Sequence, residues 1–111
     1  MTYKIINFRD IEPVPEKPGV MKRVVIGPED GAPNFIMRVF EVEPGASIPI
    51  HTHEWEHEIF VLAGKGAALT EAGEKPVAKD SVVYMPPNLP HGFANKGDEL
   101  LRMLCIIPKM D

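Results

Sequence analysis

The sequence predicts an all-β fold, a sandwich or barrel of short strands, and two observations lead to that prediction. First, 12 prolines and 9 glycines divide the 111 residues into short segments rich in β-branched and aromatic side chains. Second, none of those segments repeats apolar residues at helical spacing between capping residues. Many short strands separated by turn residues at regular intervals are typical of sandwiches and barrels.

The expected elements follow from this punctuation. Residues 11–19 contain Pro13, Pro15 and Pro18, which exclude regular helix and predict an extended arm. Residues 27–33 form a turn rich in Gly and Pro, and Pro44-Gly45 forms another. The expected strands are 3–8, 21–26, 34–42, 57–63, 66–70, 81–85, 91–94 and 99–107.

Bulk properties narrow the class of protein. The length predicts one domain, residues 1–111. The balance of 12 Lys+Arg against 16 Asp+Glu, with no basic cluster, argues against nucleic acid as a partner. No apolar run reaches the roughly 18–20 residues that cross a membrane, and the first residues lack a signal-peptide pattern. The single Cys105 stands in an apolar run, which predicts a buried thiol, and we expect a reducing cytoplasmic location.

Two predicted strands, 57–63 and 99–107, are apolar on both faces. A strand of a one-layer barrel should expose one face to water, so the outer face must be covered as well. We expect a homodimer to cover it, because large apolar patches usually mark interfaces. The alternative is that the N-terminal strands wrap around the same subunit.

All four histidines belong to one pattern, His51-x-His53-x3-His57 followed by His91. Residues two apart in a strand face the same side, so His51 and His53 point together. His57 and His91 each begin a predicted strand next to a turn. Neutral imidazole is a common metal ligand, and polar groups aimed into an apolar barrel need a partner. The pattern predicts that the four rings converge on one divalent metal; the alternative is a set of histidines satisfied in the core or at the surface.

The spacing around these histidines is regular. Gly45 is followed by five residues, His51-x-His53, three residues, His57, six residues and Gly64. Farther on, Asp80 is followed by five residues, Pro86-x-Asn88, two residues, His91, three residues and Asn95.

Together the two spacings resemble the two motifs of the cupin family over residues 34–107. The resemblance implies a cupin-type double-stranded β-helix, or jelly-roll barrel, whose core spans 34–107, with residues 1–33 supplying N-terminal strands and the Pro-rich arm. Asp80 and Asn88 replace glycines of the family pattern, and both residue types tolerate the left-handed backbone that a turn needs.

The larger departure is His57, which stands where the family usually has Glu. Glu58 is the competing candidate, but it would shorten the gap to Gly64. Neighbouring strand residues point to opposite faces, so only one of the two can reach the interior. We favour His57, and the expected metal ligands are His51, His53, His57 and His91.

The resemblance points to Mn as the metal, with Fe or Ni next and Zn as an occupant acquired in purification, although an all-nitrogen site intrinsically prefers Cu, Ni or Zn. We expect a metal-dependent, oxygenase-like enzyme that acts on a small anionic or chelating organic molecule. The alternative is a metal-assisted binding or sensor module without turnover, and isomerase or lyase chemistry remains a third class. No catalytic residue is predicted. Arg38 and Arg102 lie inside apolar strands, where an ion pair is expected first and an anchor for an anionic substrate second.

Overall fold

Ten strands form two antiparallel sheets in the computed structural model, which describes residues 2–109. The strands are β1 (Val14–Lys17), β2 (Val20–Ile26), β3 (Phe35–Val42), β4 (Ser47–His51), β5 (His57–Ala63), β6 (Lys65–Thr70), β7 (Gly73–Ala78), β8 (Val82–Met85), β9 (His91–Ala94) and β10 (Leu101–Pro108). Short 3-10 turns, η1 (Phe8–Asp10) and η2 (Pro28–Asp30), complete the elements. No helix in the described part of the chain is long and apolar enough to span a membrane.

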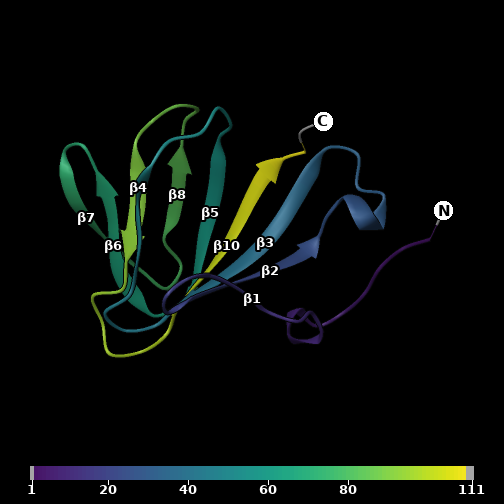
Figure 1. Cartoon of the computed structure of the whole chain (residues 1–111), viewed down its shortest axis with the longest axis horizontal. Helices are drawn as coiled ribbons and strands as arrows, with labels where there is room; N and C mark the ends of the chain where they lie inside the picture. Colours follow the sequence, from purple (N-terminus) through teal and green to yellow (C-terminus); the bar gives the residue numbers. More distant parts are fainter. Residues whose placement is uncertain (1, 110–111) are drawn as a thin grey trace.

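The two sheets face each other in the jelly-roll arrangement that the sequence predicts. One sheet has the order β1-β2-β3-β10-β5-β8, and the other has the order β4-β9-β6-β7. Figure 1 shows the first sheet fanning out from the barrel, so that β2 and β3 extend toward the N-terminal side. The core between the sheets is apolar, and its most deeply buried side chains are Val20, Val42, Val61, Leu101 and Met103. The prediction of an all-β cupin-type fold is confirmed.

The prediction of a first strand at residues 3–8 is wrong. Residues 3–8 form no strand; Tyr3 and Ile5 are largely exposed, and the segment ends in η1. Instead β2 pairs with β1, which lies inside the arm that we expected to be merely extended. Pro15 is compatible with this strand because β1 lies at the edge of its sheet, where a missing N–H breaks no central ladder.

Strand β7 is absent from the sequence prediction. It is mostly exposed and contains charged residues and Pro76, so it lacks the apolar alternation that identifies a strand. Its place at the edge of the four-stranded sheet explains why such a segment still pairs with β6. Strand β4 is also missing from the predicted strands, although the prediction that His51 and His53 point to the same side assumed a strand there. It runs from Ser47 to His51.

The motif positions that replace glycine adopt the backbone that a glycine would supply. Asp80 has φ 75° and Asn88 has φ 66°, both in the left-handed region that Asn and Asp tolerate better than other side chains. Gly64 is itself left-handed, and a Cβ there would lie 2.3 Å from the carbonyl oxygen of Leu100. These turns therefore keep their geometry although two of the family's glycines are absent.

The side chain of Asn95 forms hydrogen bonds that connect the end of β3 to the turn between β9 and β10. Its buried amide donates to the carbonyl oxygens of Val42 at 2.8 Å and Glu99 at 2.7 Å, and its Oδ1 accepts from the backbone N–H of Gly97 at 2.9 Å. The Asn95 side chain, which is 3% exposed, thus forms hydrogen bonds to backbone groups at the end of β3 and in the turn between β9 and β10. This explains the asparagine at the end of the second motif.

The N-terminal segment covers part of the outer face of the six-stranded sheet. Phe8 of η1 packs there beneath the guanidinium groups of Arg23 and Arg102, at 5.3 and 5.0 Å from the ring centre. Both guanidinium groups also bond to Glu41, and these bonds outweigh burial and lower the pKa of that carboxyl. The ion pair expected for Arg102 is confirmed, and the N-terminal segment wraps this part of its own subunit.

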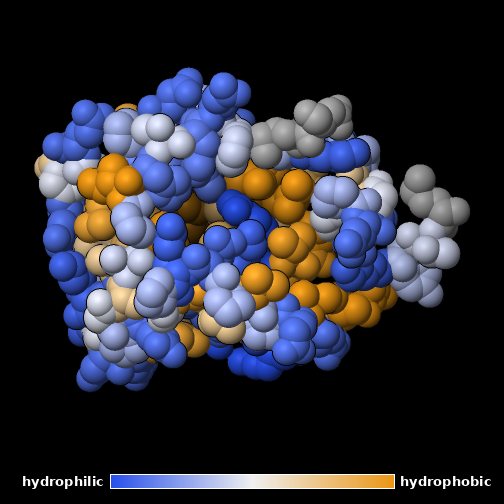
Figure 2. Space-filling view, viewed as in Figure 1, coloured by the Kyte–Doolittle hydropathy of each residue, from blue (hydrophilic) through white to orange (hydrophobic). Residues whose placement is uncertain are grey.

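Other apolar side chains of this face remain open to solvent. Phe60 lies opposite both Leu104 and Val82 in the strand register, and Phe60 and Val82 are 40% and 75% exposed. Tyr84, two residues farther along β8, is 56% exposed. Figure 2 shows the molecule from the same side as Figure 1, and in that view hydrophobic side chains lie among hydrophilic ones over the region where β3 and β10 run.

Candidate metal centre

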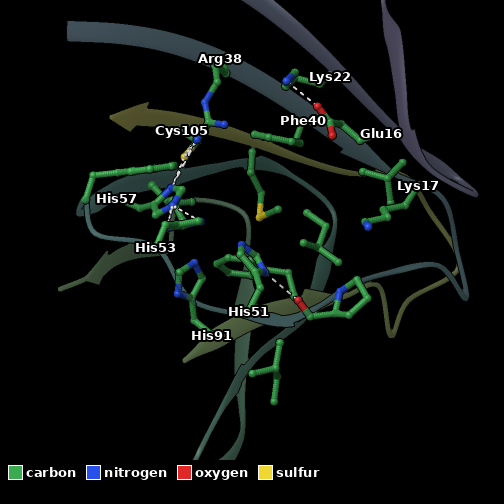
Figure 3. A pocket seen from close by; sticks show the side chains of 18 residues that line it. Glu16, Lys17, Lys22, Arg38, Phe40, His51, His53, His57, His91 and Cys105 are labelled. Atoms are coloured by element: carbon green, nitrogen blue, oxygen red, sulfur yellow. Dashed lines mark hydrogen bonds and ion pairs between the residues drawn. The ribbon is translucent and has the colours of Figure 1, made fainter. Parts of the chain in front are cut away.

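The four histidine rings lie together at one end of the cavity between the sheets. His51 ends β4, and His91 begins β9 directly opposite it in the strand register. His53 lies in the connection after β4, and His57 begins β5. The centroid separations are 4.7 Å for His51–His53 and His51–His91, 4.4 Å for His53–His57, and 5.0 Å for His53–His91 and His57–His91. Figure 3 shows the rings drawn toward one another from these elements.

Three of the rings place nitrogen atoms close enough to one another to be candidate ligands of one metal ion. One nitrogen from each of His51, His53 and His91 lies within 4.8 Å of the other two. His57 is outside this set of three, yet its Nε2 is 3.2 Å from Nδ1 and 3.1 Å from Nε2 of His53. Metal–nitrogen bonds of about 2.1 Å place adjacent ligands roughly 3 Å apart, which is the separation of His57 Nε2 from the nitrogens of His53.

Backbone carbonyl groups set the tautomers of two of these rings. Nδ1 of His51 lies 2.7 Å from the carbonyl oxygen of Pro49, and Nδ1 of His91 lies 2.8 Å from that of Leu89. A carbonyl oxygen only accepts, so each Nδ1 carries the proton and donates it. Nε2 of each ring is then left with a free lone pair. Metal-binding histidines are commonly oriented in this way by a partner on the other nitrogen.

His57 is held by a side chain instead of a carbonyl group. Its Nδ1 lies 2.9 Å from Sγ of the buried Cys105, which also accepts a hydrogen bond from the Arg38 guanidinium at 3.0 Å. Arg38 and Cys105 are cross-strand neighbours on β3 and β10, and Cys105 in turn faces Ile59 on β5. The buried thiol predicted from the sequence is confirmed, and burial raises its pKa.

Burial favours the neutral, metal-ligating form of three of the rings, those of His53, His57 and His91. Burial first, and then the charges of Arg38 and the other histidines, lower the pKa of His57 to about 3. The same two causes lower the pKa of His53, and burial is the main cause of the lowered pKa of His91. Because ligation needs neutral imidazole, these rings do not have to lose a proton at neutral pH before they can bind a cation.

A cavity of about 530 Å³ opens onto the histidines. Its walls are largely apolar, with Phe40, Ile48, Ile59 and Met103 among them. This volume is within the range of pockets that bind small organic molecules. The indole of Trp55 lies parallel to the His53 ring, with centroids 4.6 Å apart and an interplanar angle of 5°, and so forms part of the wall beside the cluster.

The structure separates His57 from its neighbour as strand parity predicts. His57 is 6% exposed and faces the cavity, whereas Glu58 points to the opposite face and is exposed. The residues to which the sequence analysis assigned no role at the site are Cys105 beside His57, and Glu16 and Lys17 of the Pro-rich arm. Cys105 left a signal in the sequence, because it stands in an apolar run. The positions of Glu16 and Lys17 beside the cavity depend on contacts between distant segments.

The protein is thus a small β-barrel with a candidate metal centre. Its two antiparallel sheets enclose a largely apolar cavity, and the histidine cluster lies at one end of that cavity. Residues 38–107 match the family described as the cupin domain. The chain therefore belongs to the cupin family.

Solved and curated proteins agree with this assignment. The polyketide cyclase RemF from Streptomyces resistomycificus superposes with a TM-score of 0.89 at 32% identity, over 96% of this chain and 80% of that one. Polyketide synthase CurC of Streptomyces cyaneus is 26% identical over 94% of this chain and 68% of its own length. An oxalate-binding protein of Thermotoga maritima is 29% identical over 60% of this chain and 56% of its own length. Similar proteins thus include some named as enzymes and some named as binding proteins.

Proposed function

We propose that His51, His53, His57 and His91 bind one divalent metal ion. The donor set supports this proposal, because His51 and His91 each direct an unprotonated Nε2 away from a carbonyl partner. The contacts of His57 Nε2 with His53 support the fourth ligand. Mn is the first choice of metal, Fe and Ni follow, and Zn is expected as an occupant acquired in purification.

The function that the site supports best is a metal-dependent, oxygenase-like enzyme acting on a small anionic or chelating organic molecule. The observation that carries it is the cavity of about 530 Å³ leading to the cluster. A bound metal supplies a Lewis acid that stabilises developing negative charge on a coordinated oxygen. The chain's own part is to hold the substrate between apolar walls and exclude water. The likeness to a polyketide cyclase favours an organic substrate larger than a two-carbon acid.

Two measurements on untagged protein from its own organism test this proposal. Elemental analysis should find close to one equivalent of a transition metal per chain. Oxygen consumption should then rise when metal-loaded protein meets a panel of 2-oxo acids and 1,3-diketones. Absence of metal would remove the ligand assignment. Metal without turnover on any compound would remove the enzyme assignment and leave the binding alternative.

The alternative is a metal-assisted binding or sensor module. One observation favours it, namely that Glu16 is the only carboxylate side chain lining the cavity within the described residues, and it pairs with Lys22. The cavity therefore offers no free carboxylate as a general base. A compound that binds tightly to metal-loaded protein and is recovered unchanged after long incubation identifies this function.

We also propose a homodimer formed through the uncovered outer face of the six-stranded sheet. Phe60, Val82 and Tyr84 form a contiguous exposed group there by strand register, beside the part that Phe8 covers. A second copy is the natural occupant, because the same face on two molecules is self-complementary about a two-fold axis. Phe60→Lys should convert the dimer to monomer in sedimentation velocity; a wild-type chain that sediments as a monomer at all concentrations contradicts it.

A further inference from the structure

Arg38 carries a charge that no carboxylate neutralises within residues 2–109. Its guanidinium contacts Cys105 Sγ at 3.0 Å and His57 Nδ1 at 3.4 Å, and it lies 4.9 Å from the centre of the Phe40 ring. Its Nε is buried and has no hydrogen-bond partner. By contrast, the two arginines on the outer face share Glu41. A partly buried guanidinium without a counter-charge is costly, so an anion that reaches it gains a strong interaction.

The end of the cavity away from the histidines is also positive. Lys17 and Lys22 line it, both carried by the hairpin of β1 and β2, and Glu16 pairs only with Lys22. Figure 3 shows Lys17 on the side of the cavity away from His57, Lys22 near Phe40, and Arg38 beside His57 and Cys105. The lining thus holds three side-chain cations and a single carboxylate. A neutral or cationic guest would leave this excess charge uncompensated.

Between these two positive ends the wall is apolar. Phe40, Met103 and Ile59 line one side from the large sheet, and Ile48 and Phe93 line the other from the small sheet. Phe40 is flanked by Arg38 and Lys22 in the strand register, so the aromatic surface and the cations belong to one continuous wall. Such a wall fits a ring or a comparably bulky apolar group attached to an acid.

We propose that the cavity selects organic acids with a bulky apolar body, and that Arg38 is the residue that binds the acid group. This assignment deepens the proposed function, on which it rests, by naming the substrate class. The acid group lies next to the histidine cluster, and the apolar body extends along Phe40 and Met103 toward Lys17. Arg38 thereby distinguishes an acid from a neutral molecule of the same shape.

Isothermal calorimetry on Mn²⁺-loaded protein tests the assignment with three probes: phenylpyruvate, pyruvate and the neutral ketone phenylacetone. Wild-type protein should bind phenylpyruvate most tightly, because pyruvate lacks the apolar body and phenylacetone lacks the charge. Arg38→Gln should weaken phenylpyruvate binding by about 10- to 100-fold, as expected for loss of a hydrogen bond to a charged group. Binding of phenylacetone should change by less than about twofold, since it makes no such bond. Arg38→Lys should recover part of the loss.

Lys75→Gln is the matched control, because it removes one positive charge from exposed strand β7, away from the cavity. It should leave all three affinities unchanged. An equal loss for phenylpyruvate and phenylacetone in Arg38→Gln would show that Arg38 only supports the site, and so would overturn the assignment. Unchanged phenylpyruvate affinity in that variant, or a wild-type protein that prefers the neutral ketone, would also overturn it.

The same titrations on metal-free protein separate this inference from the proposed function. If the histidines bind no metal, the proposed function fails, yet the tenfold or greater effect of Arg38→Gln on phenylpyruvate should persist because Arg38 belongs to the protein. If metal binds normally and the Arg38 effect is missing in both forms, the anion assignment alone fails. Metal content and melting temperature of each variant, measured in parallel, exclude a misfolded site as the cause.

Discussion

Nδ1 of His57 lies 2.9 Å from Sγ of Cys105, although the two residues are 48 positions apart in the chain. The contact arises because β5 and β10 pair in a register that places Cys105 opposite Ile59, two residues beyond His57 and on the same face. With Nδ1 engaged by sulfur, Nε2 is directed toward His53. We therefore expect Cys105 to act on the candidate centre by positioning His57, one of the proposed ligands.

Replacing Cys105 should weaken metal binding without abolishing it. Cys105→Ala removes the partner of His57 Nδ1 and of Arg38, and loss of such an orienting contact typically lowers metal affinity by about 10- to 100-fold. Cys105→Ser, which keeps an acceptor, should lose less. Competition against a chelator, followed by the fluorescence of Trp55 stacked on His53, measures both. Identical metal affinity in wild type and Cys105→Ala would show that the sulfur has no positioning role.

His57 and Glu58 provide a direct comparison of adjacent residues. His57→Ala removes a ring inside the cluster, whereas Glu58→Ala changes an exposed side chain on the other face of β5. We expect metal affinity to fall by at least about 100-fold in the first variant, as for loss of a metal ligand, and by less than about twofold in the second. Equal losses, or a larger loss for Glu58→Ala, would mean that the ligand set is misassigned.

The metal-free protein should lose stability in mild acid because of His57. Its pKa of about 3 in the folded state lies below the ordinary 6.5, so the unfolded chain binds more protons between these values. Its contribution is complete above pH 6.5 and decreases as the pH falls toward 3. Between about pH 6.5 and pH 4.5 the free energy of unfolding should drop by roughly 2 kcal/mol because of this residue.

Urea unfolding at several pH values measures this slope. His57→Gln should flatten it, leaving the smaller slope expected from His53 and His91, whose pKa values are also lowered. Glu41 is the carboxylate that would confuse the comparison, but its lowered pKa places its effect below this pH range. A slope that is the same with and without His57 would contradict the buried, neutral state of that ring.

Asn95 should matter for stability and not for metal binding directly. Asn95→Ala leaves buried carbonyl oxygens of the Val42 and Glu99 segments without donors, which should cost about 2–3 kcal/mol of unfolding free energy. Asn88→Gly is the control, because a left-handed residue replaced by glycine should change stability by less than about 1 kcal/mol. Thermal and urea unfolding compare the two; similar losses in both would show that the Asn95 hydrogen bonds are dispensable.

Much of the fold could be predicted from local sequence because its determinants are local. Proline and glycine mark the turns, β-branched residues mark the strands, and parity along β5 alone assigns His57 to the interior and Glu58 to the exterior. The left-handed turns at Asp80 and Asn88 were predictable for the same reason, since a side chain's tolerance of positive φ is a property of the residue itself.

Pairing between distant segments could not be predicted in this way. Residues 3–8 have the composition of a strand but find no partner, whereas the Pro-rich Val14–Lys17 forms β1 because the edge of β2 is open to it. The same pairing brings Lys17 to the cavity, and the pairing of β3 with β10 brings Arg38 to Cys105.

An all-β chain with four histidines at strand ends and turns could be predicted from residue pattern, because side-chain direction and backbone preference depend on near neighbours. The groups that surround those histidines are known from the folded chain alone, as is the finding that within residues 2–109 Arg38 lacks the carboxylate partner that Arg102 has. The reason is physical: a charge's surroundings depend on strand register and on which segments pack across the cavity, and neither is encoded within one strand.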